Sequence, residues 1–341
     1  MACNYCSAPK TIDSMSRETA FKVVDMAADH ATRQSLRNVC LSFFGGEPLL
    51  RKKLVFDTID YSSRVAHEKD VSFTYRLTTN GTMVDNHFVE RCRAVGLQLA
   101  LSIDGTKEAH DKHRRFRNGS PTFDAVSRAG KTILQELPDA LAMLTLNEDT
   151  VPLLFDSVGF LHAFGFKQVA IALNYASSWS EAGLDDLRLQ YGHLAKWYGE
   201  VLLSGGEFSL PLFDSKFINL VTPAIDEGRC VPGRRQFSVA ADGSIYPCTQ
   251  YVGLSTYYLG NANNGAGPDQ LKLAELAAEH LGEIPSCEGC AINQRCNHTC
   301  GCKNLASTGH ARRVSPLICT HERMLVDITD RLGEVIFEAV W

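Results

Sequence analysis

The feature that most constrains this chain is a dense run of cysteines near its carboxyl end. Five of the twelve cysteines of the 341-residue chain fall between Cys287 and Cys302, in the segment CEGCAINQRCNHTCGC. Thiolates at such spacing are typical ligands of zinc and of iron–sulfur clusters. The run therefore predicts that part of the chain folds around metal.

In a secreted protein the same density would indicate disulfides instead. The amino terminus, MACNYCSAPK, has neither the basic stretch nor the apolar core of a signal peptide, and no apolar run is long enough to span a membrane. With 45% hydrophobic residues the chain can bury a core without covalent cross-links. We therefore expect a soluble, cytoplasmic protein with no membrane partner, whose cysteines bind metal.

The charge balance excludes one class of partner. The formal net charge is −5 at neutral pH, so the chain lacks the basic surplus by which proteins bind phosphate backbones. We expect no nucleic-acid partner.

The cysteines also divide the chain into two parts. None lies between Cys92 and Cys230, whereas eight crowd the last third. A length of 341 residues allows two domains. We expect a first domain over residues 1–206 and a second over residues 207–341 that ends in a helix.

The first part alternates short apolar runs with longer amphipathic stretches. The apolar runs, each ended by turn or capping residues, are predicted strands: 38–44, 71–81, 95–105, 139–147 and 167–175. The amphipathic stretches are predicted helices: 52–68, 85–95, 122–137 and 153–165. This alternation indicates an α/β fold with a parallel sheet, closed or doubly wound. Polar residues that follow the strands then face one crevice: Gly45, Gly46, Glu47, Asn80, Ser102 and Asp104.

Motifs in these loops resemble those of the radical S-adenosylmethionine (SAM) enzymes. They are NYCS at the start, FFGGEP at 43–48, TTNG at 78–81 and SIDG at 102–105. The resemblance implies a partial (β/α)6 TIM-like barrel, here apparently without its first strand, followed by a cysteine-rich SPASM domain. It also implies SAM and a SAM-binding [4Fe-4S] cluster as cofactors.

The resemblance assigns roles to single residues. Cys3 and Cys6 would bind the SAM-binding cluster, Tyr5 would lie near the adenine, and Glu47 would approach the ammonium group of SAM. Ser102 is expected near the ribose or the carboxylate, and Arg114 as a partner of the carboxylate. The cofactor-binding residues expected on this basis are Tyr5, Gly45, Gly46, Glu47, Pro48, Asn80, Ser102, Asp104 and Arg114.

The cluster loop departs from the family pattern at one position. The family uses three cysteines, and the first would fall two residues before Met1. Two thiolates do not hold a cluster of this kind in the usual manner. We therefore expect the sequence to be a shortened form of a longer chain, and predict that this form alone does not cleave SAM.

The cysteines of the last third resemble the SPASM pattern of two auxiliary [4Fe-4S] clusters. The resemblance assigns Cys230, Cys248 and Cys300 to the first cluster, which leaves it one thiolate short. Either Cys302 or a group of the substrate could fill that position. The second cluster would have a complete set in Cys287, Cys290, Cys296 and Cys319. Structural zinc bound by the same four thiolates is the alternative.

The resemblance implies a peptide maturase that cleaves SAM reductively and uses the 5'-deoxyadenosyl radical to abstract a hydrogen from a residue of a ribosomal peptide. Thioether crosslinking is one such reaction. Its partners would be a peptide or protein substrate and an electron donor such as flavodoxin or ferredoxin. One alternative is anaerobic sulfatase maturation, which we rank second because Thr249 stands where that branch has an acidic residue. Another is an inactive peptide-binding module with structural metal.

Other cysteines and histidines have simpler interpretations. Cys40 lies in an apolar run and Cys92 on a predicted helix, so we expect both in the core. Four histidines in polar segments are expected to be exposed to solvent: His110, His113, His298 and His310.

Overall fold

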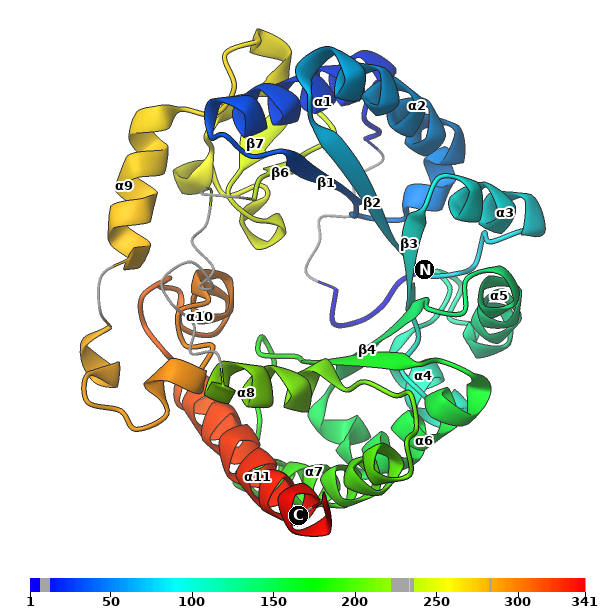
Figure 1. Cartoon of the computed structure of the whole chain (residues 1–341), viewed down its shortest axis with the longest axis vertical. Helices are drawn as coiled ribbons and strands as arrows, with labels where there is room; N and C mark the ends of the chain where they lie inside the picture. Colours follow the sequence, from blue (N-terminus) through cyan, green and yellow to red (C-terminus); the bar gives the residue numbers. More distant parts are fainter. Residues whose placement is uncertain (7–12, 222–232, 234–235, 282–283, 341) are drawn as a thin grey trace.

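The sheet of the first part has the predicted parallel topology. The computed structural model describes residues 1–6, 13–221, 233, 236–281 and 284–340. Within them, five parallel strands pair in sequence order and curl into an open half-barrel (Figure 1). The strands are β1 (Asn38–Phe43), β2 (Ser72–Thr79), β3 (Leu97–Ser102), β4 (Leu141–Leu146) and β5 (Gln168–Leu173). The predicted α/β fold class is thereby confirmed, and the carboxyl ends of all these strands meet at one edge.

Helices connect the strands and cover the outside of the curved sheet (Figure 1). They are α1 (Arg17–Arg33), α2 (Lys52–Lys69), α3 (Asn86–Ala94), α4 (Lys107–His113), α5 (Phe123–Glu136), α6 (Leu154–Phe164) and α7 (Glu181–Leu203). Their starts follow local chemistry, since the side chains of Ser16, Asp85 and Ser180 each accept a hydrogen bond from a backbone N–H of the first turn. Of these helices, the sequence predicted α2, α3, α5 and α6 but not α1, α4 and α7.

The core lies between the sheet and these helices. Leu77 and Leu101 of the strands are fully buried against side chains such as Val126 of α5. Each such side chain contributes about 1.5–3 kcal/mol by leaving water. Cys92 is fully buried in this core, as expected, but Cys40 is exposed on β1, so its assignment to the core was wrong. Cys40 belongs to an edge strand of alternating exposure, and its side chain lies on the face opposite Val39 and Leu41, which pack against the helices.

The described residues of the cysteine-rich part form a short sheet and four helices. Its short antiparallel sheet comprises β6 (Ser238–Val239), β7 (Ser244–Tyr246) and β8 (Gly260–Asn261), and its helices are α8 (Pro211–Val221), α9 (Gln270–Leu281), α10 (Gly301–Thr308) and α11 (Pro316–Val340). Single 3-10 turns connect them. The 3-10 turns of the described chain are η1 (Pro48–Arg51), η2 (Glu148–Leu153), η3 (Thr249–Tyr251), η4 (Ser255–Tyr257), η5 (Ala262–Asn264), η6 (Pro285–Cys287) and η7 (Asn293–Arg295).

The last helix joins the two parts. α11 lies along α7 (Figure 1), and a Cβ at Gly199 of α7 would stand only 2.8 Å from Leu332, so glycine permits the close approach. His321 of α11 meets the hydroxyls of Tyr175 at 2.8 Å and of Tyr191 at 3.0 Å. α11 belongs to the predicted second domain but packs on the first. The predicted boundary at residue 206 therefore stays a prediction.

Long as α7 and α11 are, none of the helices in the described part carries an apolar stretch that could cross a bilayer.

Candidate functional site

Glu47 links the loops that follow β1 and β2. It caps η1, and its Oε1 accepts hydrogen bonds from Leu49 N at 3.1 Å and Thr79 Oγ1 at 2.8 Å. Its Oε2 accepts from Asn80 N at 2.8 Å. One carboxylate therefore fixes the GGEP loop, which ends at Pro48, against the end of the next strand.

The glycines of this loop border open space. Gly45 has a φ of +145°, which favours glycine, and a Cβ added at Gly45 or Gly46 would meet no protein atom within 4 Å. Both residues are exposed at the carboxyl edge of the sheet. Their backbone is therefore accessible to a ligand, as the SAM assignment requires.

Asp104 and Arg114 form a buried ion pair beyond β3. Arg114 donates from Nε to Oδ2 at 2.7 Å and from Nη2 to Oδ1 at 2.9 Å, and Thr145 N donates to Oδ1 at 2.8 Å. Burial alone would lower the pKa of Arg114, but the adjacent carboxylate of Asp104 raises it above the ordinary value. Asp104 is thus the partner of Arg114 in the structure, and the predicted contact of Arg114 with SAM stays a prediction.

Tyr5 completes this cluster from the amino-terminal segment. Its hydroxyl donates to Asp104 Oδ2 at 3.2 Å, and the Arg114 guanidinium carbon lies 5.4 Å from its ring centroid. Burial raises the pKa of Tyr5, so its hydroxyl keeps its proton. The ring of Tyr5 is therefore held by the Asp104–Arg114 ion pair, which follows β3 in the chain. Ser102, the last residue of β3, is half-buried.

Backbone hydrogen bonds hold the first cysteines at this edge. Ala2 N donates to Arg115 O at 2.8 Å, and Asn4 N donates to His113 O at 3.3 Å. Cys3 is half-buried and Cys6 is exposed. Thiols are suitable ligands for an iron–sulfur cluster, and here they lie on the side of the sheet that carries Glu47 and Asp104.

His110 is part of this site, which the sequence did not reveal. It is fully buried, its Nδ1 accepts from Asp104 N at 3.2 Å, and its Nε2 lies 3.0 Å from Thr122 Oγ1. Thr122 Oγ1 donates to Arg114 O, so the imidazole donates from Nε2. Burial lowers the pKa of His110 to about 4 and keeps the ring neutral.

The expectation that the histidines are exposed was wrong for three of them. His110 and His298 are buried, and the side chain of His113 is only 10% exposed, whereas His310 is exposed as expected. His113 lies 2.9 Å from Asn4 Oδ1 and 2.8 Å from Asp149 Oδ1, which buries it under the amino-terminal segment. Polar neighbours in sequence do not report such contacts.

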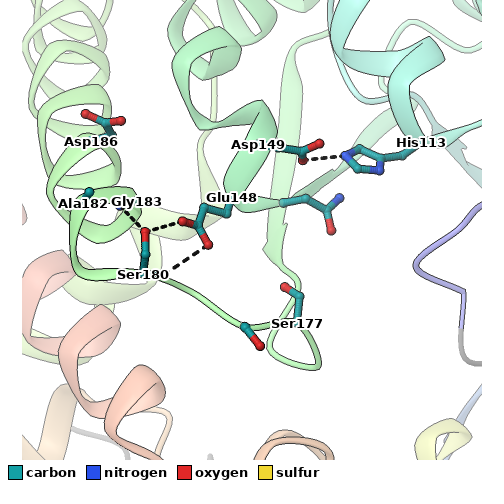
Figure 2. A pocket seen from close by; sticks show the side chains of 10 residues that line it. His113, Glu148, Asp149, Ser177, Ser180, Ala182, Gly183 and Asp186 are labelled. Atoms are coloured by element: carbon teal, nitrogen blue, oxygen red, sulfur yellow. Dashed lines mark hydrogen bonds and ion pairs between the residues drawn. The ribbon is translucent and has the colours of Figure 1, made fainter.

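A cavity of about 550 Å³ lies beyond the carboxyl ends of β4 and β5 (Figure 2). Glu148 accepts from the backbone N of Ser180 at 3.1 Å and from its hydroxyl, which fixes the start of α7 on one wall. His113 and Asp149 form another wall. The lining residues are His113, Asn147, Glu148, Asp149, Ser177, Ser178, Ser180, Ala182, Gly183 and Asp186. The sequence reading missed this site, because loop residues of these types also occur on ordinary surfaces.

Four of the predicted metal ligands gather near the start of α11. They are half-buried: Cys287, Cys290, Cys296 and Cys319. Burial raises the pKa of Cys287, and the neighbouring thiols of Cys290 and Cys319 raise it further. Arg323 Nη2 lies 3.5 Å from Cys290 Sγ. The structure therefore brings the predicted set of the second auxiliary cluster into one region.

A buried ion pair holds this cysteine loop in place. Lys216 of α8 and Glu322 of α11 are each about 1% exposed and form a salt bridge. Lys216 Nζ also donates to Arg295 O at 3.0 Å, and Glu322 Oε2 accepts from Asn297 N at 3.0 Å. The residues on both sides of Cys296 are thereby fixed to two helices.

Cys248, Cys300 and Cys302, the remaining described cysteines of the second part, form a separate group. Cys302 Sγ donates to Cys248 Sγ across 3.0 Å, and hydrogen bonding from Cys302 lowers the pKa of both Cys248 and Cys300. Cys230, predicted for the same cluster, lies outside the described residues.

Two observations concern the ligand chemistry. The cysteines of the described ranges are free thiols. In the same ranges, no three His, Cys, Asp or Glu side chains have the arrangement that holds a single metal ion. A [4Fe-4S] cluster places each thiolate on a different iron, and cysteine thiols are the donor set it requires.

Comparisons with known proteins agree with this geometry. Residues 1–154 match the model of the radical SAM superfamily. A cysteine-type anaerobic sulfatase-maturating enzyme of Clostridium perfringens strain 13 is 24% identical over 76% of this chain and 74% of its own length. A PqqA peptide cyclase of Xanthomonas oryzae pv. oryzae is 24% identical over 93% of this chain and 84% of its own.

A solved structure extends the likeness to the whole fold. Native anSMEcpe with bound AdoMet and Kp18Cys peptide superimposes with a TM-score of 0.82 at 21% identity, covering 99% of this chain and 96% of that one. The family motifs, the parallel half-barrel and the matched model agree that residues 1–154 form a radical SAM domain.

Proposed function

We propose that this protein is a radical SAM maturase that modifies a residue of a ribosomal peptide, with thioether crosslinking as a candidate reaction. The observation that carries the proposal is that a PqqA peptide cyclase matches 93% of the chain, so the likeness extends beyond the radical SAM domain. The site at the carboxyl edge of the barrel and the thiol-rich second part support it.

The residues at the barrel edge suit a bound SAM and its cluster. Cys3 and Cys6 are the described thiols that would hold the cluster there. When bound, the cluster supplies the electron that cleaves SAM to the 5'-deoxyadenosyl radical, which removes a carbon-bound hydrogen from the substrate. Glu47 holds the GGEP loop so that the backbone of Gly45 and Gly46 faces the open side.

We assign the cavity beyond β4 and β5 to the substrate. His113 lines this cavity and also contacts Asn4, which lies between the two amino-terminal cysteines. A substrate residue in the cavity would therefore lie beside the proposed cluster loop. The carboxylates of Glu148, Asp149 and Asp186 provide acceptors for peptide N–H groups or for a basic side chain.

The thiols of the second part would hold two auxiliary clusters. Cys287, Cys290, Cys296 and Cys319 make a complete set for one of them. The proposed role of the two auxiliary clusters is to accept an electron from the substrate radical or to bind the substrate. The electron for SAM cleavage would come from a flavodoxin or a ferredoxin.

Sulfatase maturation is the second candidate. It is favoured by the sulfatase-maturating relative, and the fold likeness over 99% of the chain is compatible with it. Against it stands Thr249, which follows Cys248 where an acidic residue is expected in that branch. Both candidates use the same radical SAM domain and differ in the peptide and in the bond formed.

One assay separates the candidates. Protein from the complete reading frame is purified anaerobically and given dithionite, SAM, and either a cysteine-rich precursor peptide from a neighbouring gene or a sulfatase-derived peptide. Thioether formation removes two hydrogen atoms from the peptide, whereas formylglycine formation replaces the thiol of a cysteine by an aldehyde. Mass spectrometry of the peptide, together with 5'-deoxyadenosine, identifies the reaction.

A matched pair of variants connects the assay to the site. Glu47→Gln weakens the hydrogen bonds to Thr79 and Asn80, and we expect SAM affinity to fall about 10-fold, equivalent to about 1.4 kcal/mol. Glu90→Gln, at an exposed position of α3, is expected to keep wild-type affinity. Absence of iron and of 5'-deoxyadenosine from the wild-type protein would refute the proposal.

A further inference from the structure

We propose that Cys302 is a ligand of the first auxiliary cluster, together with Cys248 and Cys300. The inference rests on the proposed function only in taking this part of the chain to hold a cluster. The sequence pattern left that cluster one thiolate short and did not decide between Cys302 and the substrate.

The geometry of three thiols supports the assignment. Cys302 Sγ lies 3.0 Å from Cys248 Sγ, although the two residues are 54 positions apart in sequence. Cys300, two positions before Cys302, packs against the same buried group as Cys302 and Cys248. The side chain of Cys302 is therefore the common neighbour of the two thiols that the family pattern already assigns to one cluster.

The local backbone suits this role. Cys300 is the N-cap of α10 and Cys302 is the second residue of that helix, with Gly301 between them. Backbone N–H groups at a helix amino terminus stabilise thiolates, which are the form that binds iron. Gly301 has no side chain to stand between the two sulfurs.

The burial of Cys302 differs from that of a core cysteine. Cys92 is fully buried within the large apolar core of the barrel. Cys302, 6% exposed, lies in a small group with Tyr246 and Tyr251, in which Cys248 is also a member. A cysteine of the core needs no other sulfur near it, whereas Cys302 contacts Cys248 and shares its buried group with Cys300.

Binding a cluster would separate these sulfurs. Each thiolate of a [4Fe-4S] cluster binds its own iron, so the hydrogen bond between Cys302 and Cys248 would be replaced by two iron–sulfur bonds and the thiol protons would be released. With Cys302 as a ligand, a substrate thiolate is not required to complete the first cluster.

The test compares cysteine variants in a background that carries Cys3→Ala and Cys6→Ala, which removes the amino-terminal thiols. Cys302→Ser preserves the side-chain size, Cys302→Ala removes the ligand atom, and Cys92→Ala is the matched control at a buried cysteine of the core. Each protein is reconstituted anaerobically with iron and sulfide, and its iron and sulfide are counted. It is then treated with ferricyanide and examined by electron paramagnetic resonance, which detects a cluster that has lost one iron.

With Cys302 intact we expect about 8 Fe per chain that resist ferricyanide, because both auxiliary clusters are held by thiolates. Both Cys302 variants are expected either to lose one cluster, about 4 Fe, or to give a [3Fe-4S] signal after oxidation. If both Cys302 variants keep their iron and give no [3Fe-4S] signal, as we expect for Cys92→Ala, the inference is overturned and the proposed function still stands. A background protein that binds no iron would overturn both.

Discussion

The carboxyl edge of the barrel and the cysteine-rich part differ in the binding partners of their functional side chains. At the barrel edge, protein partners already hold the important polar groups: Glu47 bonds to Thr79 and Asn80, and Asp104 bonds to Arg114 and Tyr5. In the cysteine-rich part the functional groups are free thiols carried on short turns and on the first turns of α10 and α11. The first region is organised by its own hydrogen bonds, whereas the second offers donors whose natural partner is metal.

We expect folding and metal binding to be coupled to different degrees in these two regions of the chain. The sheet and its helices bury a large apolar core, which stabilises the barrel edge regardless of any ligand. The apolar groups around β7 and η3 are much smaller. Metal binding contributes folding free energy where a core is small. Four predictions test this difference, in order of expected effect.

Removing the clusters should affect the second part far more than the first. After anaerobic removal of the proposed clusters with excess chelator, we expect hydrogen exchange in residues 284–310 to accelerate about 100-fold or more, while the amides of β2, β3 and β4 keep their protection. Mass spectrometry of peptic fragments measures both regions in one sample. Equal loss of protection in both would contradict the comparison.

Lys216→Met should cost about 3–5 kcal/mol of unfolding free energy, because it leaves Glu322 buried without its cation. Urea unfolding monitored by circular dichroism measures the change. Lys167→Met, which breaks an exposed pair with Glu207, is the control and should change the midpoint very little. The double variant Lys216→Met, Glu322→Leu should recover much of the loss, and no recovery would argue against an unpaired charge as the cause.

His110 should make the stability of the barrel depend on pH. Burial lowers its pKa to about 4, whereas the unfolded chain has a value near the ordinary one of about 6.5. The unfolded state therefore binds more protons between these values, and this contribution to stability is lost as pH falls from about 6.5 to 4, by up to about 3 kcal/mol.

Urea unfolding at a series of pH values measures this slope. His110→Gln should flatten it in that window, and His310→Gln, at an exposed position, should leave it as in the wild type. An unchanged slope in His110→Gln would mean that another group causes the dependence.

Two cysteines outside the thiol groups should give the smallest effects. Cys92→Ser places a hydroxyl in the apolar core and should cost about 1–3 kcal/mol, whereas Cys40→Ser, on an exposed position, should change stability by less than about 0.5 kcal/mol. Neither should change the iron content of the reconstituted protein. Loss of iron from either variant would show that the set of ligands is incomplete.

Much of the barrel could be predicted because its strands are short apolar runs ended by turn residues, and β1 to β5 fall on the predicted segments. The burial of His110 could not, since it depends on the backbone of Asp104 and on Thr122. The cavity could not be predicted either, because Glu148 and Ser180 come from separate loops. Cysteine spacing separated two ligand sets, but only the fold shows that Cys302 reaches Cys248.

The packing of α11 on α7 has a consequence for electron transfer. α11 carries Cys319 in its first turn, and Ser180, the N-cap of α7, lies on the wall of the cavity. The hydrogen bonds of His321 join the cysteine-bearing end of α11 to Tyr191 in the middle of α7 and to Tyr175 in the loop after β5. Because tunnelling rates fall steeply with distance, two packed helices in place of flexible loops would hold the gap between the proposed substrate cavity and the proposed auxiliary cluster constant from one turnover to the next.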